Sequence, residues 1–241
     1  MIDVHTHILP AMDDGSKDLN MTAEMIRTEA AQGVRKIVAT PHFYAHRTKI
    51  DEFLERRSRR LQQVSGLLAS EPDLPGLAYG AEVYYFPGIG SASRIESLCV
   101  EGTDILLLEM PFAQWTDQEY MDVSDLIKRK HLHIVLAHID RYWGLQKKKQ
   151  IWNDIMDLPL TRQINAESLL AGGAKRFSVK FLKQHGRVVL GSDCHNLTSR
   201  PPNLSQAREL IKKKIGSEVL TQIDALAENL YKDAALCGSG D

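Results

Sequence analysis

The sequence predicts an α/β protein whose fold is a distorted TIM-like barrel of about seven strand–helix units. Short apolar runs alternate with longer amphipathic segments, which is the order expected of parallel strands joined by right-handed helical crossovers. Almost every apolar run stops at a histidine, aspartate or glutamate. A barrel collects its functional groups at the carboxyl ends of its strands, whereas a doubly wound sheet concentrates them at one switch point. The length of 241 residues suits one such barrel, so we expect a single domain over residues 1–241.

The first half of the chain is predicted to alternate strand and helix from its first residues. Asp18 is expected to cap a helix that carries Met25 and Ile26 on its inner side and that Gly33 ends. Two prolines in the segment 70–76 end the next, strongly charged helix. The expected strands are 1–7, 36–41 and 77–81, and the expected helices are 19–32, 51–69 and 93–98.

The second half is predicted to continue this alternation. Pro111 separates the strand that ends at Glu109 from the helix that follows it. Further strands are expected before His138 and before Asp193, because both residues follow apolar runs. The expected strands are 105–108, 133–137, 161–165 and 188–193, and the expected helices are 116–129, 145–156, two small ones before residue 188, and a final helical segment over 203–235.

Composition and charge indicate an ordinary cytoplasmic enzyme. The formal net charge is -1 and the sequence pI is about 6.8, so charge gives no reason to expect binding to nucleic acid or to a membrane surface. No apolar stretch reaches spanning length, and Met1 leads directly into a strand, so we expect neither membrane insertion nor a signal segment. The three cysteines, at 99, 194 and 237, form no CxxC pair, and we expect no disulfide framework. The sequence gives no indication of the oligomeric state.

Histidines and carboxylates occur in positions that suit a metal site. His5 and His7 are two positions apart in a strand, so their side chains point to the same side and can bind one ion together. Asp193 and His195 repeat this arrangement near the other end of the chain. Nitrogen and oxygen ligands without a thiolate favour Mn²⁺, Fe²⁺ or Zn²⁺. Four more strand ends lead to a residue of the same kind, namely His42, Glu82, Glu109 and His138.

These residues stand within longer motifs, which are His5-x-His7, Asp13-Asp14-Gly15, Thr40-Pro41-His42, Glu82, Glu109, His138-x-x-Arg141, Ser192-Asp193-x-His195-Asn196 and Arg200-Pro201-Pro202. The set resembles the PHP (polymerase and histidinol phosphatase) superfamily. Within it, the similarity is closest to the bacterial manganese-dependent protein tyrosine phosphatases of capsular and exopolysaccharide operons. The resemblance extends over about residues 1–202. One departure is Ile139-Asp140, where these relatives commonly have Pro-Glu before the arginine.

The resemblance implies a PHP fold and hydrolysis of phosphotyrosine by a metal-activated hydroxide. Arg141 and Arg200 would hold the phosphoryl oxygens, because a guanidinium group presents a planar fork to phosphate. Asp13 is a candidate acid for the departing phenolate, and the alternative is that it only shapes the turn at Gly15. The resemblance implies three ions, Mn²⁺ first with Fe²⁺ or Zn²⁺ as alternatives, bound by His5, His7, Asp14, His42, Glu82, Glu109, His138, Asp193 and His195. The implied partner is a phosphotyrosyl protein, the tail of a bacterial tyrosine autokinase that regulates capsule or exopolysaccharide synthesis.

Three other readings of the sequence compete with this one. Cys194 and Arg200 have the C-x5-R spacing of cysteine-dependent tyrosine phosphatases, but no glycine lies between them to let a phosphate loop curl. A PHP phosphatase for a small phosphomonoester such as histidinol phosphate would use nearly the same ligands. An inert PHP module that serves as a binding scaffold would be expected to have lost ligands, and none is lost here.

Other histidines and basic runs are expected to be structural or solvated. The basic cluster 56–60 is interpreted as a solvated helix face, with a dock for an acidic phosphopeptide as the alternative. The lysine runs 147–149 and 212–214 are interpreted in the same way. The histidines expected to have structural roles are His46, His131, His133 and His185.

Overall fold

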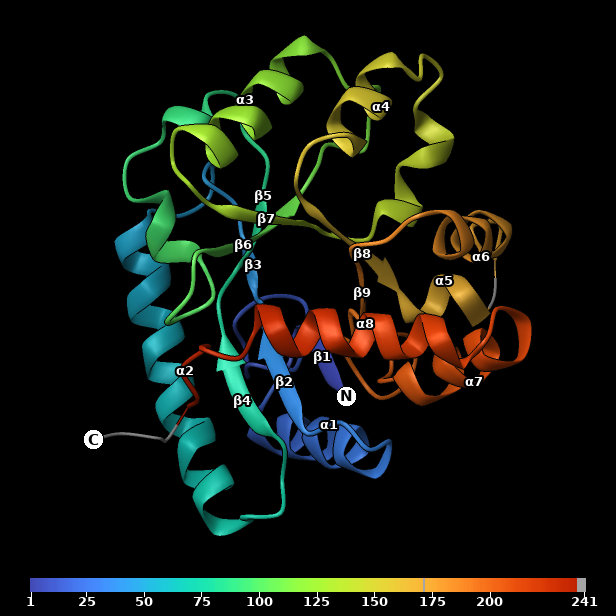
Figure 1. Ribbon diagram of the computed structural model, residues 1–241. Coiled ribbons are helices and arrows are strands. Elements are labelled where there is room, and N and C mark those ends of the chain that lie inside the picture. Colours follow the sequence, from blue (N-terminus) through green and yellow to red (C-terminus); the bar gives the residue numbers. More distant parts are fainter. Residues whose placement is uncertain (171, 238–241) are drawn as a thin grey trace.

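The computed structural model describes residues 1–170 and 172–237, and it shows parallel strands surrounded by helices (Figure 1). The strands form two sheets with the orders β1-β2-β4 and β3-β5-β6-β7-β8-β9. Within each sheet, every pair of neighbouring strands is parallel. The strands are β1 (Ile2–Thr6), β2 (Lys36–Ala39), β3 (His42–Phe43), β4 (Gly76–Tyr79), β5 (Glu82–Tyr84), β6 (Ile105–Glu109), β7 (His133–Leu136), β8 (Thr161–Asn165) and β9 (Val188–Gly191). The predicted α/β class with parallel strands is confirmed.

The two sheets are joined at both of their ends. Two residues separate β2 from β3, and two separate β4 from β5, so each pair is one strand with a step in it. Pro41 lies at the first step, where its missing N–H prevents the ladder from continuing. At the other end β1 lies beside β9, through a single parallel bridge between Thr6 and Cys194. Counted in this way there are seven strand units in a barrel-like circle, although the ladder around it is not continuous.

The helices lie outside the strands, and α8 lies across β1 and β9 (Figure 1). Ala227 and Tyr231 of this C-terminal segment pack in one apolar cluster with Ile2, Val38 and Val189 of the strands. A second apolar cluster fills the space between the strands and the other helices. The α-helices are α1 (Leu19–Ala31), α2 (Ile50–Ser70), α3 (Asp117–Lys128), α4 (Gln150–Met156), α5 (Ala166–Leu170), α6 (Lys175–Gln184), α7 (Leu204–Lys214) and α8 (Ser217–Leu230). Short 3₁₀ helices are η1 (Ile89–Ser91), η2 (Ile95–Leu98), η3 (Ile139–Arg141) and η4 (Trp143–Leu145).

Local signals in the sequence locate most helix ends. The side chain of Asp18 accepts a hydrogen bond of 2.9 Å from Met21 N and so caps α1, as predicted. Thr116 and Glu119 form a reciprocal capping box at the start of α3. Among the described residues, no helix is long and apolar enough to cross a membrane.

Three predicted helices are wrong in extent or type. The helix expected over 145–156 begins only at Gln150, because the buried Gln146 side chain binds the backbone of Trp115 and Ala113 instead. The segment 203–235 contains two helices, since Gly216 breaks it with a φ of 129°. The helix near 93–98 is a 3₁₀ turn that follows Arg94, whose φ of 62° is incompatible with a continuous α-helix.

Candidate metal centre

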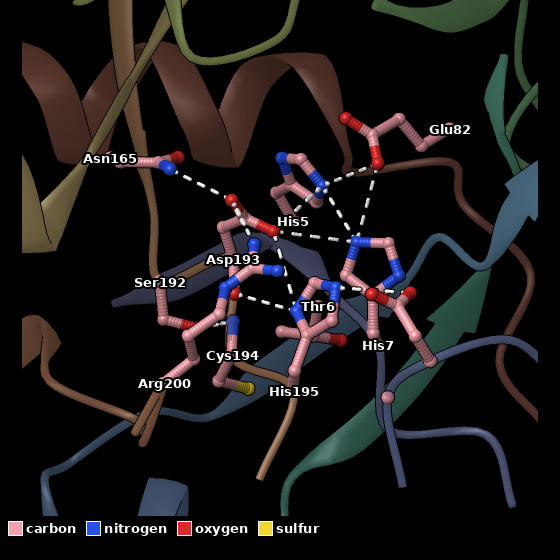
Figure 2. Close-up of polar contacts among 12 residues, drawn as sticks. His5, Thr6, His7, Glu82, Asn165, Ser192, Asp193, Cys194, His195 and Arg200 are labelled. Atoms are coloured by element: carbon pink, nitrogen blue, oxygen red, sulfur yellow. Dashed lines mark hydrogen bonds and ion pairs between the residues drawn. The ribbon is translucent and has the colours of Figure 1, made fainter. Parts of the chain in front are cut away.

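The side chains of the nine predicted ligands converge at the carboxyl ends of the strands. Figure 2 shows five of them, His5, His7, Glu82, Asp193 and His195. The ligand atoms form overlapping groups in which they lie within 4.8 Å of one another, namely His7 with Asp14, His42 and His195; His5 with His7 and Asp193; and His42 with Glu82 and Glu109. His138 joins them because its Nε2 lies 2.8 Å from Glu82 Oε1 and 3.4 Å from Glu109 Oε1. Glu82 therefore occupies the middle of the cluster.

Two of these residues adopt backbone conformations that L-residues seldom populate. His138 has φ 30° and Asp193 has φ 54°, both in the left-handed region. Each lies two positions beyond the last residue of a strand, so the turn of the backbone there directs its side chain into the cluster. Strained non-glycine residues of this kind persist where the surrounding structure holds them, and they gather at functional sites.

Hydrogen bonds at the outer nitrogens of His5 and His7 define their tautomers. His5 Nδ1 lies 3.2 Å from the side-chain oxygen of Gln163, and His7 Nδ1 lies 2.7 Å from Asp13 Oδ2. Because both Nδ1 atoms face acceptors, each must carry the proton. The two Nε2 atoms lie 3.1 Å apart. With Nδ1 of each ring committed to its acceptor, both Nε2 atoms are the positions left to bind one cation, so the residues present fit a metal ion.

Unpartnered polar atoms lead to the same conclusion. His42 Nδ1 lies 2.9 Å from Glu82 Oε2, yet the angles exclude a hydrogen bond, and neither atom has a hydrogen-bond partner among the described residues. The buried Nε2 of His195 also has none. Buried polar atoms are almost always satisfied in native proteins, so three orphaned ligand atoms in one cluster indicate a missing partner.

Electrostatics in the cluster favour the metal-binding protonation states of Glu82 and His195, whereas His7 and His138 favour the protonated state. Burial by itself would raise the pKa of Glu82, but the imidazoles around it, above all His5 and His42, lower it well below its usual range. Burial and repulsion from His7 lower the pKa of His195 to about 3, so this imidazole is neutral at neutral pH. At His138 burial alone would lower the pKa, but hydrogen bonds to the carboxylates of Glu109 and Glu82 raise it to about 9. A proton and a metal ion therefore compete for the same position between these carboxylates.

Arg141 and Arg200 both reach the cluster. The Nη2 atoms of the two arginines each lie 2.6 Å from Asp193 Oδ2. Their side chains are 32% and 29% exposed, so both guanidinium groups lie between the buried ligands and solvent. Asn196 turns the chain back after His195, because its side-chain oxygen accepts hydrogen bonds from backbone N–H groups up to Arg200.

Asp13 is occupied by structural hydrogen bonds. Besides binding His7, it accepts hydrogen bonds from His42 N at 2.8 Å and from Gly15 N at 2.9 Å. Burial would raise the pKa of Asp13, but contact with His7 lowers it below its usual range. Gly15 itself lies so close to this histidine that an added Cβ would be 2.1 Å from His7 O. This geometry favours the alternative reading, in which Asp13 shapes the turn and orients His7.

Two amide side chains that the sequence interpretation missed hold the ligands in place. Gln163 Nε2 donates to Asn165 Oδ1 at 2.8 Å, and Asn165 Nδ2 donates to Asp193 Oδ2 at 2.8 Å. The oxygen of Gln163 accepts hydrogen bonds from His5 Nδ1 and from His138 N. A series of hydrogen bonds thus runs from His5 to Asp193 through Gln163 and Asn165 of β8, a strand that neither contains nor leads to a predicted ligand. The signal was present, since Gln163 and Asn165 are amide residues two positions apart in a predicted strand and therefore share one face.

Cys194 does not belong to the cluster. Its side chain is fully buried, its sulfur lies 3.9 Å from Glu29 Oε1, and Figure 2 shows it turned away from the Asp193 carboxylate. Burial raises the pKa of this thiol well above its usual value, and the charge of Glu29 raises it further. The thiol is therefore not a nucleophile, which argues against the cysteine mechanism.

The four other histidines lie outside the cluster. His133 Nε2 lies 2.9 Å from the Thr161 hydroxyl, and His185 stacks on Phe181 with ring centroids 4.1 Å apart. His46 contacts only the edge of the Tyr44 ring among its aromatic neighbours.

Comparison with known proteins places the chain in one family. The sequence profile described as "Capsular polysaccharide synthesis, CpsB/CapC" matches residues 1–230. The chain is 29% identical over 227 residues to the tyrosine-protein phosphatase CpsB of Streptococcus pneumoniae, covering 90% of this chain and 92% of that protein. It is 28% identical over 244 residues to the tyrosine-protein phosphatase YwqE of Bacillus subtilis (strain 168), covering 98% and 93%.

A solved structure supports the same assignment. This solved structure superimposes on the structure of the present chain with a TM-score of 0.83 at 26% identity, and the match covers 98% of this chain and 96% of the other. It comes from a study of YwqE from Bacillus subtilis and CpsB from Streptococcus pneumoniae, described as unique metal-dependent tyrosine phosphatases. The resemblance read from the motifs is confirmed, and the chain belongs to the CpsB/CapC family of capsular polysaccharide synthesis.

Proposed function

We propose that this protein is a metal-dependent protein tyrosine phosphatase. One observation carries the proposal, namely the cluster of nine nitrogen and oxygen ligands, all of them buried or nearly so except Asp14, with two arginines at its solvent edge. The relatives named as tyrosine-protein phosphatases, and the related structure described as metal-dependent, support it.

The donor set suits several hard or borderline cations. Five imidazoles and four carboxylates exceed what one ion requires, and the absence of thiolate among them suits Mn²⁺, with Fe²⁺ or Zn²⁺ as alternatives. Three ions would be held by His5, His7, Asp14, His42, Glu82, Glu109, His138, Asp193 and His195. When bound, such ions supply Lewis-acid chemistry, which activates water at neutral pH and neutralises charge on phosphoryl oxygens.

The arginines would bind the phosphoryl group. Arg141 and Arg200 approach from different segments and converge on one carboxylate oxygen of Asp193, so an anion beside that oxygen meets two guanidinium forks. Asp13 would act as a positioning residue for His7 rather than as the acid that protonates the departing phenolate.

An aromatic side chain at the rim favours an aryl ester over a small alkyl phosphate such as histidinol phosphate. Phe112 is 47% exposed, and its ring lies nearly parallel to that of His138, with centroids 6.0 Å apart. An exposed ring beside a phosphate site offers stacking to the phenyl ring of phosphotyrosine.

The proposed substrate is a phosphotyrosyl protein, the tail of a bacterial tyrosine autokinase involved in capsule or exopolysaccharide synthesis. The family assignment to capsular polysaccharide synthesis supports this partner. Residues 1–241 would act as a single PHP-type metallophosphatase domain in the cytoplasm. The contact between β1 and β9 supports one domain, since it joins the first and the last strand of the described chain.

Chelation tests the metal requirement. Protein stripped of metal should lose phosphatase activity on a phosphotyrosyl peptide, and Mn²⁺ should restore it best among common divalent ions. Turnover of histidinol phosphate, measured in parallel, should be far slower. Full activity in metal-free protein would overturn the proposal, and a preference for histidinol phosphate would favour the alternative function.

Substitution of the arginines tests phosphate binding. Arg141→Ala and Arg200→Ala should each lower kcat/KM by about tenfold to a hundredfold, because a charged hydrogen bond contributes roughly 1.5–3 kcal/mol. The bound metal, measured by elemental analysis, should stay close to normal. Replacement by lysine should rescue poorly, since a point charge does not reproduce the fork. Unchanged kinetics in both alanine variants would exclude these residues from the site.

A further inference from the structure

A cavity of about 440 Å³ opens beside the metal cluster. It shares three lining residues with the cluster region, Asp13, Asp14 and His42. The other residues that line it are Met12, Tyr44, Arg47, Thr48, Phe53 and Arg56. Anything bound at the metals therefore has this cavity as its immediate neighbour.

Two arginines of the cavity carry charges that no protein carboxylate offsets. Arg47 lies over the ring of Tyr44, with its guanidinium carbon 4.6 Å from the ring centroid, and it makes no ion pair with any described residue. Arg56 donates a hydrogen bond to Met12 O, on the loop that leads to Asp13, and it too makes no ion pair within the described part of the chain. Both guanidinium groups are thus positioned by neutral partners and keep donors for a ligand.

The rest of the basic cluster 56–60 is used elsewhere. Arg57 is buried and donates to Gly80 O at 2.8 Å. Arg59 pairs with Glu55 at 3.5 Å on the exposed side of α2, and Arg60 bonds with Gln63. Within this cluster only Arg56 lines the cavity. The two interpretations of this basic cluster therefore apply to different residues. Arg56 lines the cavity beside the metal cluster, and Arg57, Arg59 and Arg60 do not.

The acidic residues of the lining are already engaged. Asp13 binds His7 and two backbone N–H groups, as described above. Asp14 Oδ1 lies 3.5 Å from the Nε2 atoms of both His42 and His195, in the group of ligands that fits a cation. Asp13 is thus paired with His7, and Asp14 lies beside two imidazoles, so among the described residues the charges of the lining that have no partner of opposite sign are those of Arg47 and Arg56.

We infer that this cavity is a substrate subsite for an aspartate or glutamate side chain close to the phosphotyrosine in the protein substrate. The inference rests on the proposed function. An extended peptide rises about 3.3 Å per residue, so a side chain one to three positions from the phosphotyrosine reaches a cavity that adjoins the cluster. Guanidinium groups bind carboxylates through paired, charge-assisted hydrogen bonds.

Matched phosphopeptides test the inference. Three peptides should be compared that differ only in having glutamate, glutamine or lysine at the positions flanking phosphotyrosine, with kcat/KM measured on the manganese-loaded, full-length protein. We expect the glutamate peptide to exceed the glutamine peptide by about threefold to tenfold and the lysine peptide to be the poorest, mainly through KM. The preference should weaken as ionic strength rises, because screening reduces it.

Charge-matched variants separate local contact from the general field of the protein. Arg47→Gln and Arg56→Gln should each reduce the ratio of kcat/KM for glutamate and glutamine peptides, and the double variant should bring it close to one. Arg59→Gln removes the same charge from the same helix at a residue that does not line the cavity, and it should leave the ratio intact.

The results of these measurements distinguish a failure of the subsite from a failure of the proposed function. Equal turnover of the three peptides by the unmodified protein, or a ratio that Arg59→Gln lowers as much as Arg56→Gln, would overturn the subsite while leaving the phosphatase function in place. Failure to hydrolyse any of the three peptides would instead overturn the proposed function and the subsite with it.

Discussion

At the scale of single residues, the centre depends on groups that do not themselves face a metal. Gln163 and Asp13 each hold the Nδ1 proton of one histidine, and this leaves the two Nε2 atoms free to act as ligands. Partners of this kind commonly contribute tenfold to a hundredfold in metal affinity. Candidate ligands can be read from the sequence, but the partner that selects the tautomer of His5 comes from a strand 158 positions away.

Replacing Gln163 tests this dependence. Gln163→Leu keeps the approximate volume but removes the acceptor for His5 Nδ1 and for His138 N. We expect metal affinity, measured by titration of the stripped protein, to fall by about tenfold to a hundredfold. Thr161→Val is the control, since Thr161 lies on the same strand and contacts His133 outside the cluster. Equal affinity in both variants would show that the amide is dispensable.

Cys194 provides a test of mechanism. Because its thiol is buried on the far side from the Asp193 carboxylate, Cys194→Ser should keep at least about a tenth of the normal kcat/KM, with the loss due to packing. Thiol alkylation should inhibit far less than chelation, and rapid quenching should trap no phosphocysteine. An inactive Cys194→Ser protein that is folded and fully metallated would show that the cysteine mechanism is correct after all.

A pair of buried acids behind the cluster makes stability depend on pH. Burial raises the pKa of Glu29 well above its usual range, and the charge of the neighbouring Asp3 raises it further. At a pH between the unfolded and the folded pKa, the Glu29 carboxyl group keeps its proton in the folded state, whereas the same group has lost its proton in the unfolded chain. Folding then takes up a proton, so this contribution to stability is present below the unfolded pKa of about 4.5 and is lost as pH rises toward the folded pKa.

Glu29→Gln should remove most of that dependence. The free energy of unfolding, from urea titrations at several pH values between 5 and 8, should decline less with pH in the variant than in the unmodified protein. A parallel decline in the two proteins would show that Glu29 is ionised in the folded state.

At the scale of helices and strands, the sequence predicted positions better than it predicted interruptions. Strand 161–165 and the start of α1 were correct, because alternation and a cap residue are local signals. The sequence interpretation missed two interruptions, the break at Gly216 and the late start of α4. The late start depends on Gln146, whose side chain binds the backbone of Trp115, 31 positions earlier in the chain. Most predicted ligands were identified because they end an apolar run, whereas Asp14 came only from the resemblance to the PHP superfamily. Arg47 lies in a turn with no such marker.

The cap of α1 gives a prediction at this scale. Asp18→Ala removes the acceptor for Met21 N and should lower the free energy of unfolding by about 1 kcal/mol, within a range of about 0.5–2. Asp18→Asn keeps an acceptor and should cost much less. Both values follow from urea titrations, and equal stability of the alanine and asparagine variants would show that the cap contributes nothing.

At the scale of the whole molecule, the metal cluster should also be a source of stability. It draws ligands from six strand units and brings several buried carboxylates together, which repel one another without a cation. A ligand present at a hundred times its dissociation constant stabilises the folded state by about 2.7 kcal/mol per site. For a chain of this length, each kcal/mol raises the melting temperature by about 2–4 °C.

Calorimetry with and without metal measures this contribution. The chelated protein should melt about 5–10 °C below the manganese-loaded protein for each ion lost. His5→Ala should show a smaller difference between the two conditions, because it binds less metal. Identical melting temperatures would mean that the cluster forms without any contribution from ions.

The contact between β1 and β9 has a consequence for how the protein is made. Ser192 N donates a hydrogen bond to Asp3 across 189 positions of the chain, and the predicted ligands His5 and Asp193 lie within two positions of its ends. During synthesis on the ribosome, His5 and His7 are therefore exposed long before Asp193 and His195 have been added. The nascent chain must keep its first strand unpaired on one side until residues 192–195 have emerged, and only then can the set of predicted ligands be completed.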